Sequence, residues 1–307
     1  MNDDDAGTVG ADAFVCSGFF YMVEVILMTE IKSFAVIGGD KRQIYCGQSL
    51  QEDGFDVYFG GFDKCSEKYR LTAHKPDELI GLCDAFILPL PCTRDKLHVN
   101  APFAEENIPL SLFESVKDKK PVFCGMKERL PFEGQKIYDY STSEEFAVLN
   151  AVPTAEGAIE TAMHEYEGTL NGSRCLVTGY GRIGKILSFM LRGIGADVTV
   201  SSQRKDAHAF IRAEGMKAIL SSELCGRYDI IFNTAPSLLF DRKTLTSLVG
   251  SPLIIDLASY PGGVDTKAAD DLSLRVMQAL SLPGKVAPKS AGIIIKNAVY
   301  NILGEEL

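Results

Sequence analysis

Three glycines in the middle of the chain have the spacing that suits the phosphates of a nucleotide. Gly179, Gly181 and Gly184 follow the apolar run 175–178 directly and open an apolar-periodic stretch that ends near residue 195. A strand, a glycine turn and a helix in this order bring the free N–H groups of the helix N-terminus to a pyrophosphate. The first glycine permits the tight turn, the second lets the backbone approach the ligand, and the third lets helix and strand pack. The pattern predicts dinucleotide binding by the whole loop: Gly179, Tyr180, Gly181, Arg182, Ile183 and Gly184. The alternative is a glycine cluster that only packs a helix.

The end of the next strand indicates which dinucleotide is bound. Sites for NAD usually carry a carboxylate there, which accepts a hydrogen bond from the ribose 2′-OH. Here the strand 197–200 is followed by Ser201, Ser202, Arg204 and Lys205, and the first carboxylate is Asp206. Hydroxyls and cations hold a 2′-phosphate, whereas a carboxylate repels it. The sequence therefore favours NADP, with NAD as the second choice. The alternative is that Arg204 and Lys205 are a solvated helix start.

Polar loops follow the later strands of the same region. In an open parallel sheet, ligands lie outside the carboxyl ends of the strands. We therefore expect Asn233, Thr234, Pro236 and Ser259 to contact the cofactor. The alternative is that these residues only turn the chain at the strand ends.

The elements that must position these residues alternate between strand and helix. Apolar runs that predict strands lie at 33–37, 56–59, 84–88, 121–125 and 136–140, and again at 175–178, 197–200, 217–219, 229–232, 253–256 and 275–277. Helical stretches lie between most of them, including one near 112–117, which predicts parallel sheets covered on both faces. The fold class is α/β, with two Rossmann-like domains, the second a typical dinucleotide-binding domain, and a cleft between them.

The domain boundaries follow from this alternation. Pro153 and Thr154 are good helix-start residues, so a linking helix is expected from about 150 to 169. We expect a substrate-side α/β domain at 31–150, a NADP-binding domain at 151–287, and a last helix at 288–307 that packs back on the first domain. Residues 1–30 are irregular and read as an N-terminal extension, disordered or non-native, with Met28 as the natural start.

Composition excludes several classes of function. The chain has 307 residues, a formal net charge of −10 and 46% hydrophobic residues, which argues against a nucleic-acid binder. The eight cysteines are scattered without C-x-x-C spacing, as in a reduced cytoplasmic protein with buried thiols. No His and Cys cluster predicts a metal site. The apolar stretch 13–28 contains a Glu and is short for a membrane span, so no membrane partner is expected.

Six motifs resemble one family, the A subunit of dipicolinate synthase from spore-forming bacteria. The motifs are IGGDKRQ at 37–43, VPTAEG at 152–157, GYGRIG at 179–184, NTAPS at 233–237, DLASYPGG at 256–263 and LPGKVAPKSAG at 282–292. The resemblance runs in register from about residue 31 to residue 307, and its first and last motifs are much more specific than the glycine loop.

The resemblance implies an activity and a partner. The family oxidises dihydrodipicolinate to pyridine-2,6-dicarboxylate, which fills the spore core during sporulation. Its members resemble nicotinamide-dependent dehydrogenases and work with a B subunit that looks like a flavoprotein. A homodimer is also expected.

A substrate with two carboxylates needs cations and hydrogen-bond donors, and the resemblance directs attention to such residues. We expect catalytic roles for Glu156, as the base, and for Lys289 and Arg42. We expect substrate contacts from Lys41, Thr93, Arg94 and Ser290. Each has an ordinary structural alternative: a solvated helix start, a surface loop, or, for Glu156, a first-turn carboxylate favoured by the helix dipole.

Two other functions fit the domain plan. A D-2-hydroxy-acid dehydrogenase would need a base, usually a His, after a late strand of the cofactor domain. The loops 259–264 and 279–285 contain no His, which counts against this function. A non-catalytic NADP-binding module is the other alternative.

Overall fold

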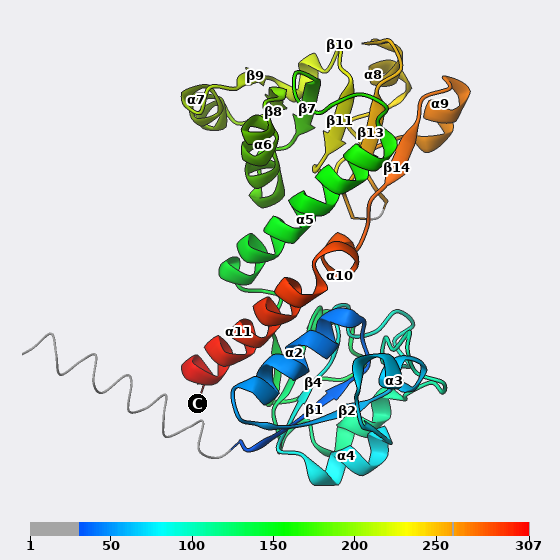
Figure 1. The fold of residues 1–307 in the computed structure, drawn as a ribbon, viewed down its shortest axis with the longest axis vertical. Helices are drawn as coiled ribbons and strands as arrows, with labels where there is room; N and C mark the ends of the chain where they lie inside the picture. Colours follow the sequence, from blue (N-terminus) through cyan, green and yellow to red (C-terminus); the bar gives the residue numbers. More distant parts are fainter. Residues whose placement is uncertain (1–30, 260, 307) are drawn as a thin grey trace, which may run out of the picture. The chain divides into compact units, whose positions relative to one another are not determined.

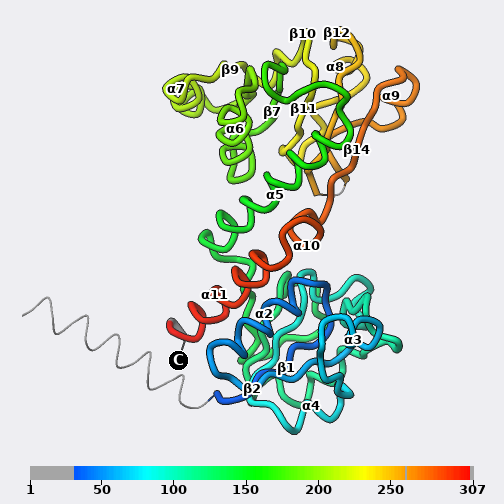
Figure 2. Tube along the Cα trace, in the orientation of Figure 1, coloured from blue at the N-terminus to red at the C-terminus, as the bar shows by residue number. Residues whose placement is uncertain are grey.

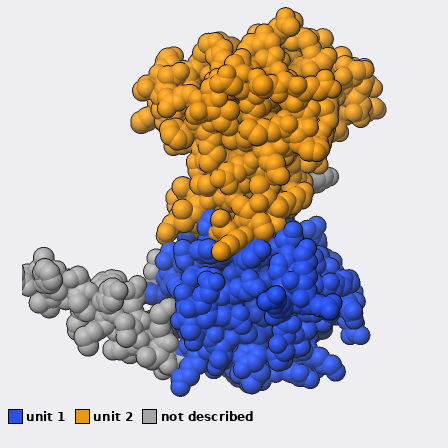
Figure 3. Space-filling view, viewed as in Figure 1, with its two compact units in different colours: residues 1–143, 292–307 blue, residues 144–291 orange. Residues whose placement is uncertain are grey.

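The computed structural model describes residues 31–259 and 261–306, and the expectation for residues 1–30 falls outside this part. The chain divides into two compact units, which are described separately (Figure 3). The first consists of residues 1–143 with 292–307, and the second of residues 144–291.

The first unit is built on a six-stranded parallel sheet with the order β3-β2-β1-β4-β5-β6. Figure 1 labels β1, β2 and β4 of this sheet. Its strands are β1 (Ser33–Ile37), β2 (Asp56–Gly60), β3 (Ala73–His74), β4 (Ala85–Ile87), β5 (Val122–Cys124) and β6 (Ile137–Asp139). Its helical elements are α2 (Lys41–Glu52), η1 (Asp63–Cys65), α3 (Ser66–Tyr69), α4 (Pro76–Leu82), η2 (Leu110–Ser115), η3 (Lys127–Arg129) and most of α11 (Pro288–Glu306). Every residue of β1, β4 and β5 is buried, as expected for strands covered on both faces.

The helix α11 completes the first unit. Figures 1 and 2 show this last helix alongside α2. The fit is close, because a Cβ on Gly292 would lie 2.5 Å from the carbonyl oxygen of Arg42. Farther along α11, Lys296 and Tyr300 both donate to the carboxylate of Asp53, which follows α2, over 2.6 and 2.7 Å. The apolar residues Ile295 and Val299 of α11 are buried.

The second unit repeats the same sheet topology. Its six parallel strands have the order β14-β13-β11-β7-β8-β9, the 3-2-1-4-5-6 arrangement of dinucleotide-binding folds. These strands are β7 (Arg174–Thr178), β8 (Asp197–Ser201), β9 (Lys217–Ile219), β11 (Ile230–Asn233), β13 (Leu253–Asp256) and β14 (Val276–Gln278), with a separate short pair β10 (Gly226–Arg227) and β12 (Leu248–Val249). The helices are α5 (Glu144–Glu165), α6 (Arg182–Ile194), α7 (Lys205–Ala213), η4 (Ser221–Glu223), α8 (Arg242–Thr246), α9 (Thr266–Asp271) and α10 (Leu282–Val286).

Two helical expectations need correction. The helix expected from residue 150 begins six residues earlier, so Pro153 lies inside α5 and not at its start. Proline is costly inside a helix because it has no N–H for the ladder, but the buried face of α5 holds Pro153 in place. The hydroxyl of Thr154 donates to the carbonyl of Asn150 over 2.7 Å and does not cap the helix. The stretch expected near 112–117 is the 3-10 helix η2.

Two further properties concern the described residues as a whole. None of their helices combines the length and the apolar character needed to cross a bilayer. Their seven cysteines are unpaired, and only Cys225 is exposed.

Candidate functional site

The glycine loop lies between β7 and α6, and each of its three glycines is required for a different reason. Gly179 has φ +93°, which side-chain residues rarely adopt. A Cβ on Gly184 would overlap the carbonyl oxygen of Gly179, so this glycine lets helix and strand approach. Gly181 is exposed, and a Cβ there would meet no atom within 4 Å. The space in front of Gly181 is therefore open to a ligand.

The N-terminus of α6 presents donors toward this open space. Gly181 is the N-cap residue and has no side chain with which to cap the first turn. The N–H groups of that turn are therefore left for another acceptor. An anion such as a pyrophosphate supplies one and also interacts favourably with the helix dipole.

The larger side chains of the loop point to protein partners. The hydroxyl of Tyr180 donates to Glu214 over 2.9 Å, and the ring is almost fully buried. Burial, and then Glu214, raise the pKa of Tyr180 to about 12. Arg182 forms a two-pronged ion pair with Glu144, the first residue of α5. Because these two side chains are engaged within the protein, the part of the loop that remains to contact a ligand is its backbone.

The residues expected to determine whether NADP or NAD is bound lie together at the end of β8. Ser201 is fully buried, and its hydroxyl has no hydrogen-bond partner among the residues that the structure describes. The hydroxyl of Ser202 accepts from the backbone N–H of Arg204 over 3.2 Å. The exposed side chain of Arg204 pairs with Asp206, whose pKa falls to about 2 because Arg204 donates to it. Lys205 begins α7 and is exposed.

A buried polar network holds the ends of three neighbouring strands. Thr178, Asn233 and Asp256 are the last residues of β7, β11 and β13 and lie opposite one another in register. The hydroxyl of Thr178 donates to Asn233 over 2.5 Å, and the Asn233 amide donates to Asp256 over 2.8 Å. Asp256 also accepts from the backbone N–H groups of Ala258 and Gly263.

Because its members bond to one another, this network leaves their side chains fewer groups with which to contact a ligand. The amide of Asn233, which was expected to contact the cofactor, is fully buried and bonded at both ends. Thr234 lies beside the glycine loop, where its hydroxyl donates to the Thr178 carbonyl over 2.8 Å. Pro236 and Ser259 are exposed. Sequence reasoning missed Thr178 and Asp256, because only strand register brings them to Asn233.

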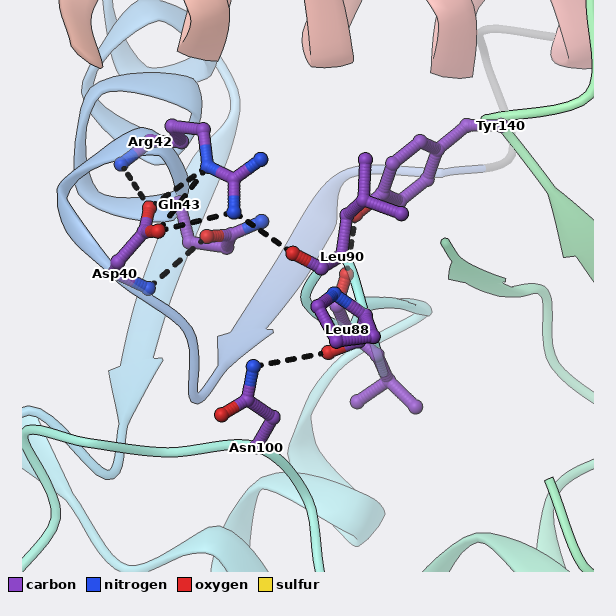
Figure 4. A network of polar contacts seen from close by, with 8 residues as sticks. Asp40, Arg42, Gln43, Leu88, Leu90, Asn100 and Tyr140 are labelled. Atoms are coloured by element: carbon purple, nitrogen blue, oxygen red, sulfur yellow. Dashed lines mark hydrogen bonds and ion pairs between the residues drawn. The ribbon is translucent and has the colours of Figure 1, made fainter. Parts of the chain in front are cut away.

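In the first unit, Arg42 lies at the centre of a polar network (Figure 4). Its guanidinium forms a bidentate ion pair with Asp40, with Nε–Oδ1 at 2.9 Å, and Nη2 donates to the carbonyl of Leu90 over 2.7 Å. Asp40 is the N-cap of α2 and forms a capping box with Gln43. Lys41 is half-buried beside them.

The loop after β4 carries the other expected substrate contacts. Thr93 is buried, and its hydroxyl lies 3.3 Å from Asp95 and accepts from the backbone N–H of Lys96. Arg94 is exposed and donates to the side chain of Asn100 over 3.1 Å. Together with His98, the residues Arg94 and Asn100 line a cavity of about 250 Å³.

The remaining expected residues lie in the second unit. Glu156 on α5 is exposed, as are Lys289 and Ser290 in the first turn of α11. Within the described part of the chain, the side chains of Glu156 and Lys289 have no ion-pair or hydrogen-bond partner. The described residues also contain no group of three or more His, Cys, Asp and Glu that could hold a metal ion.

Two parallel sheets of dinucleotide-binding topology, one with an open glycine loop, define the class as the two-domain dehydrogenase fold. The transhydrogenase of Sinorhizobium meliloti shares this fold with a TM-score of 0.63, covering 89% of this chain and 94% of the other at 16% identity. The family profile described as the N-terminal domain of the dipicolinate synthase A subunit matches residues 33–130.

Two relatives match over most of the chain. The A subunit of dipicolinate synthase from Bacillus subtilis (strain 168) is 32% identical over 294 residues, covering 91% of this chain and 98% of the relative. The crystal structure of the corresponding A subunit from Bacillus halodurans has a TM-score of 0.78 and 28% identity, covering 89% and 97% of the two chains. The chain belongs to the family of dipicolinate synthase A subunits.

Proposed function

We propose that this protein oxidises dihydrodipicolinate to pyridine-2,6-dicarboxylate by hydride transfer to NADP, with NAD as the alternative cofactor. The observation that carries the proposal is the open, uncapped glycine loop at Gly181 in a member of this family. The substrate loses one hydride and one proton, and NADP⁺ becomes NADPH. Aromatisation of the ring favours the reaction, so the protein has mainly to orient the reactants and place charge.

The residues present fit a dinucleotide. In this proposal the backbone of Gly181 and the first turn of α6 hold the pyrophosphate. Ser202, Arg204 and Lys205 hold the 2′-phosphate, for which Arg204 has to exchange Asp206 for the ligand. Thr234 and Ser259 lie at the carboxyl ends of β11 and β13 and flank the nicotinamide. When bound, the cofactor supplies the hydride acceptor.

The protein's own residues handle the substrate. Lys289 and Ser290, in the first turn of α11, bind a carboxylate of the substrate. Glu156 accepts the proton that the ring loses. Its exposed, unpaired carboxylate supports this role. We further propose a cytoplasmic homodimer that works in sporulation with a flavoprotein B subunit, since the name of the Bacillus subtilis relative marks it as one part of a larger synthase.

One assay tests the proposal. The purified protein is mixed with NADP⁺ and freshly made aldol product of pyruvate and aspartate semialdehyde, and NADPH and pyridine-2,6-dicarboxylate are followed together. The assay is run with and without a candidate flavoprotein. Matched formation of both products supports the proposal. Binding of NADP⁺ without either product under both conditions would refute the reaction and favour a non-catalytic NADP-binding module.

Cofactor choice needs a separate measurement. Replacing both Arg204 and Lys205 with Ala should weaken NADPH binding about tenfold or more, because charge-assisted bonds to the 2′-phosphate are lost. Binding of NADH should change less than twofold. If both affinities fall together, the two cations do not select the cofactor.

A further inference from the structure

The first unit has a sheet topology at which ligands bind in other open α/β folds. Its sheet has the same 3-2-1-4-5-6 order as the second, so β2 lies on one side of β1 and β4 lies on the other side. Loops after such strands diverge, and in open α/β sheets ligands bind in the crevice between them. Here the loop after β1 carries residues 38–43, and the loop after β4 carries residues 88–100. They are joined by bonds from Arg42 to the Leu90 carbonyl and from Gly39 N–H to the Asn100 carbonyl.

Arg42 presents unused donors at this position. A guanidinium has five N–H bonds. Nε bonds to Asp40, and Nη2 bonds to Asp40 and Leu90. No described residue accepts from Nη1, so two N–H bonds remain. The side chain is only 9% exposed and is held by its ion pair, so these two donors are fixed in direction.

Gln43 adds a second unused donor. The residue is fully buried, and no residue in the described part of the chain accepts a hydrogen bond from its amide nitrogen. The amide cannot be turned around to solve this, because its oxygen accepts from the backbone N–H of Asp40 over 3.2 Å. Figure 4 shows this nitrogen on the side of Gln43 that faces the guanidinium and Leu90. A buried donor without a partner destabilises the fold, and an acceptor from outside the chain would remove that cost.

The surrounding loop is shaped to this side chain. Gly39 has φ +99°, and a Cβ on it would lie 2.7 Å from Cγ of Gln43 and closer still to the end of its amide. Gly38 has φ +70°, and a Cβ there would lie 2.7 Å from Val99 in the loop after β4. Both glycines thus let the backbone close around Gln43 and bring the two loops together.

We infer that Arg42 and Gln43 form the anchor for one carboxylate of the substrate, with Arg42 Nη1 and Gln43 Nε2 as the donors. The identity of that substrate rests on the proposed function. A carboxylate fits better than a phosphate because Asp40 offsets the charge of the guanidinium, and the remaining donors then suit the single charge of one carboxylate group better than the double charge of a phosphate group. The Gln43 nitrogen has no exposed surface, so this proposal requires the Leu90 segment to shift when the carboxylate enters. Asp40 is a positioning residue that aims the guanidinium.

The test is the binding of pyridine-2,6-dicarboxylate to the full chain, measured by titration calorimetry. Gln43→Glu keeps the oxygen that completes the capping box but replaces the free donor with an acceptor. Arg42→Lys keeps the charge but loses the fixed fork. We expect each variant to weaken binding at least tenfold. Gln51→Glu is the matched control, with the same change on the exposed side of α2, and it should bind within twofold of wild type.

The possible outcomes distinguish a failure of the proposed anchor from a failure of the proposed reaction. Thermal unfolding identifies any variant that fails to fold, and the other variant then decides. If wild type forms product but both folded variants bind as it does, the anchor is wrong and the proposed function stands. If the variants lose binding but wild type forms no product, the anchor stands and the reaction is wrong. Failure of wild type to bind pyridine-2,6-dicarboxylate overturns the anchor, and competition by millimolar inorganic phosphate overturns its assignment to carboxylates.

Discussion

Gly181 and Gly184 lie three residues apart in one loop, yet alanine should mainly reduce cofactor binding at Gly181 and mainly reduce stability at Gly184. At Gly184 the new Cβ would overlap the Gly179 carbonyl oxygen and lie 3.0 Å from its carbon. A backbone group cannot rotate away, so we take the upper part of the overpacking range, about 3 kcal/mol. Alanine recovers about 1 kcal/mol of helix propensity. The net loss of about 2 kcal/mol corresponds to a fall of about 4–8 °C in the unfolding midpoint.

At Gly181 the methyl group would enter open space, so the fold should tolerate it. Alanine is a poorer N-cap than glycine by about 0.5 kcal/mol, which lowers the midpoint by about 1–2 °C. The same methyl group occupies the approach to the pyrophosphate. NADPH binding, followed by nucleotide fluorescence, should therefore weaken at least tenfold, while wild type and Gly181→Ala unfold at similar temperatures.

Either of two results would refute this reasoning. If Gly181→Ala binds NADPH within twofold of wild type, the open space is not where the dinucleotide lies. If Gly184→Ala unfolds at the wild-type temperature, the close approach of α6 to β7 does not require glycine.

Three further predictions concern the rest of the chain. Asp256→Ala leaves three buried donors unpaired and should lower the free energy of unfolding in urea by about 3 kcal/mol. The control Asp265→Ala removes only the N-cap of α9 and should lower it by about 1 kcal/mol. Equal losses in the two variants would contradict the network. Hydrogen bonds from Arg174 lower the pKa of Asp229, so this carboxylate stabilises the fold above about pH 4 and loses that effect as pH falls through its folded pKa. The midpoint of Asp229→Asn should therefore start lower at pH 7 and fall less between pH 6 and pH 3 than that of wild type; parallel curves would exclude the linkage. Among the described cysteines only Cys225 is exposed, so a thiol reagent should label its peptide first, and Cys225→Ser should remove that label while the buried thiols react only on unfolding.

The sequence predicted those parts of the fold whose signal is local. The glycine loop was predictable because its spacing, the preceding apolar run and the following helix all lie within one short stretch. The parallel arrangement of the strands was also predictable, since alternating strands and helices favour parallel sheets. The start of α5 was not, because Pro153 resembles a helix start while the preceding run 144–152 lacks a clear period.

The site was predictable only in part, for a related reason. Asn233 bonds to residues 55 and 23 positions away, and these contacts depend on strand register. Arg42 meets Leu90, 48 positions away, through a crossover in the sheet. The exception is Gln43, whose spacing from Asp40 is that of a capping box and could have been read directly.

The return of α11 to the first unit has a consequence for synthesis on the ribosome. Residues 31–143 emerge first, but the face of α2 stays uncovered until Gly292, Ile295 and Val299 have been made. The whole second unit, residues 144–291, is translated in between, which takes roughly 7–30 s at 5–20 residues per second. The second unit is contiguous and can fold as it emerges. The first unit therefore reaches its final form last, although its synthesis begins first. The face of α2 that α11 later covers is the surface that a nascent-chain chaperone would have to protect in the meantime.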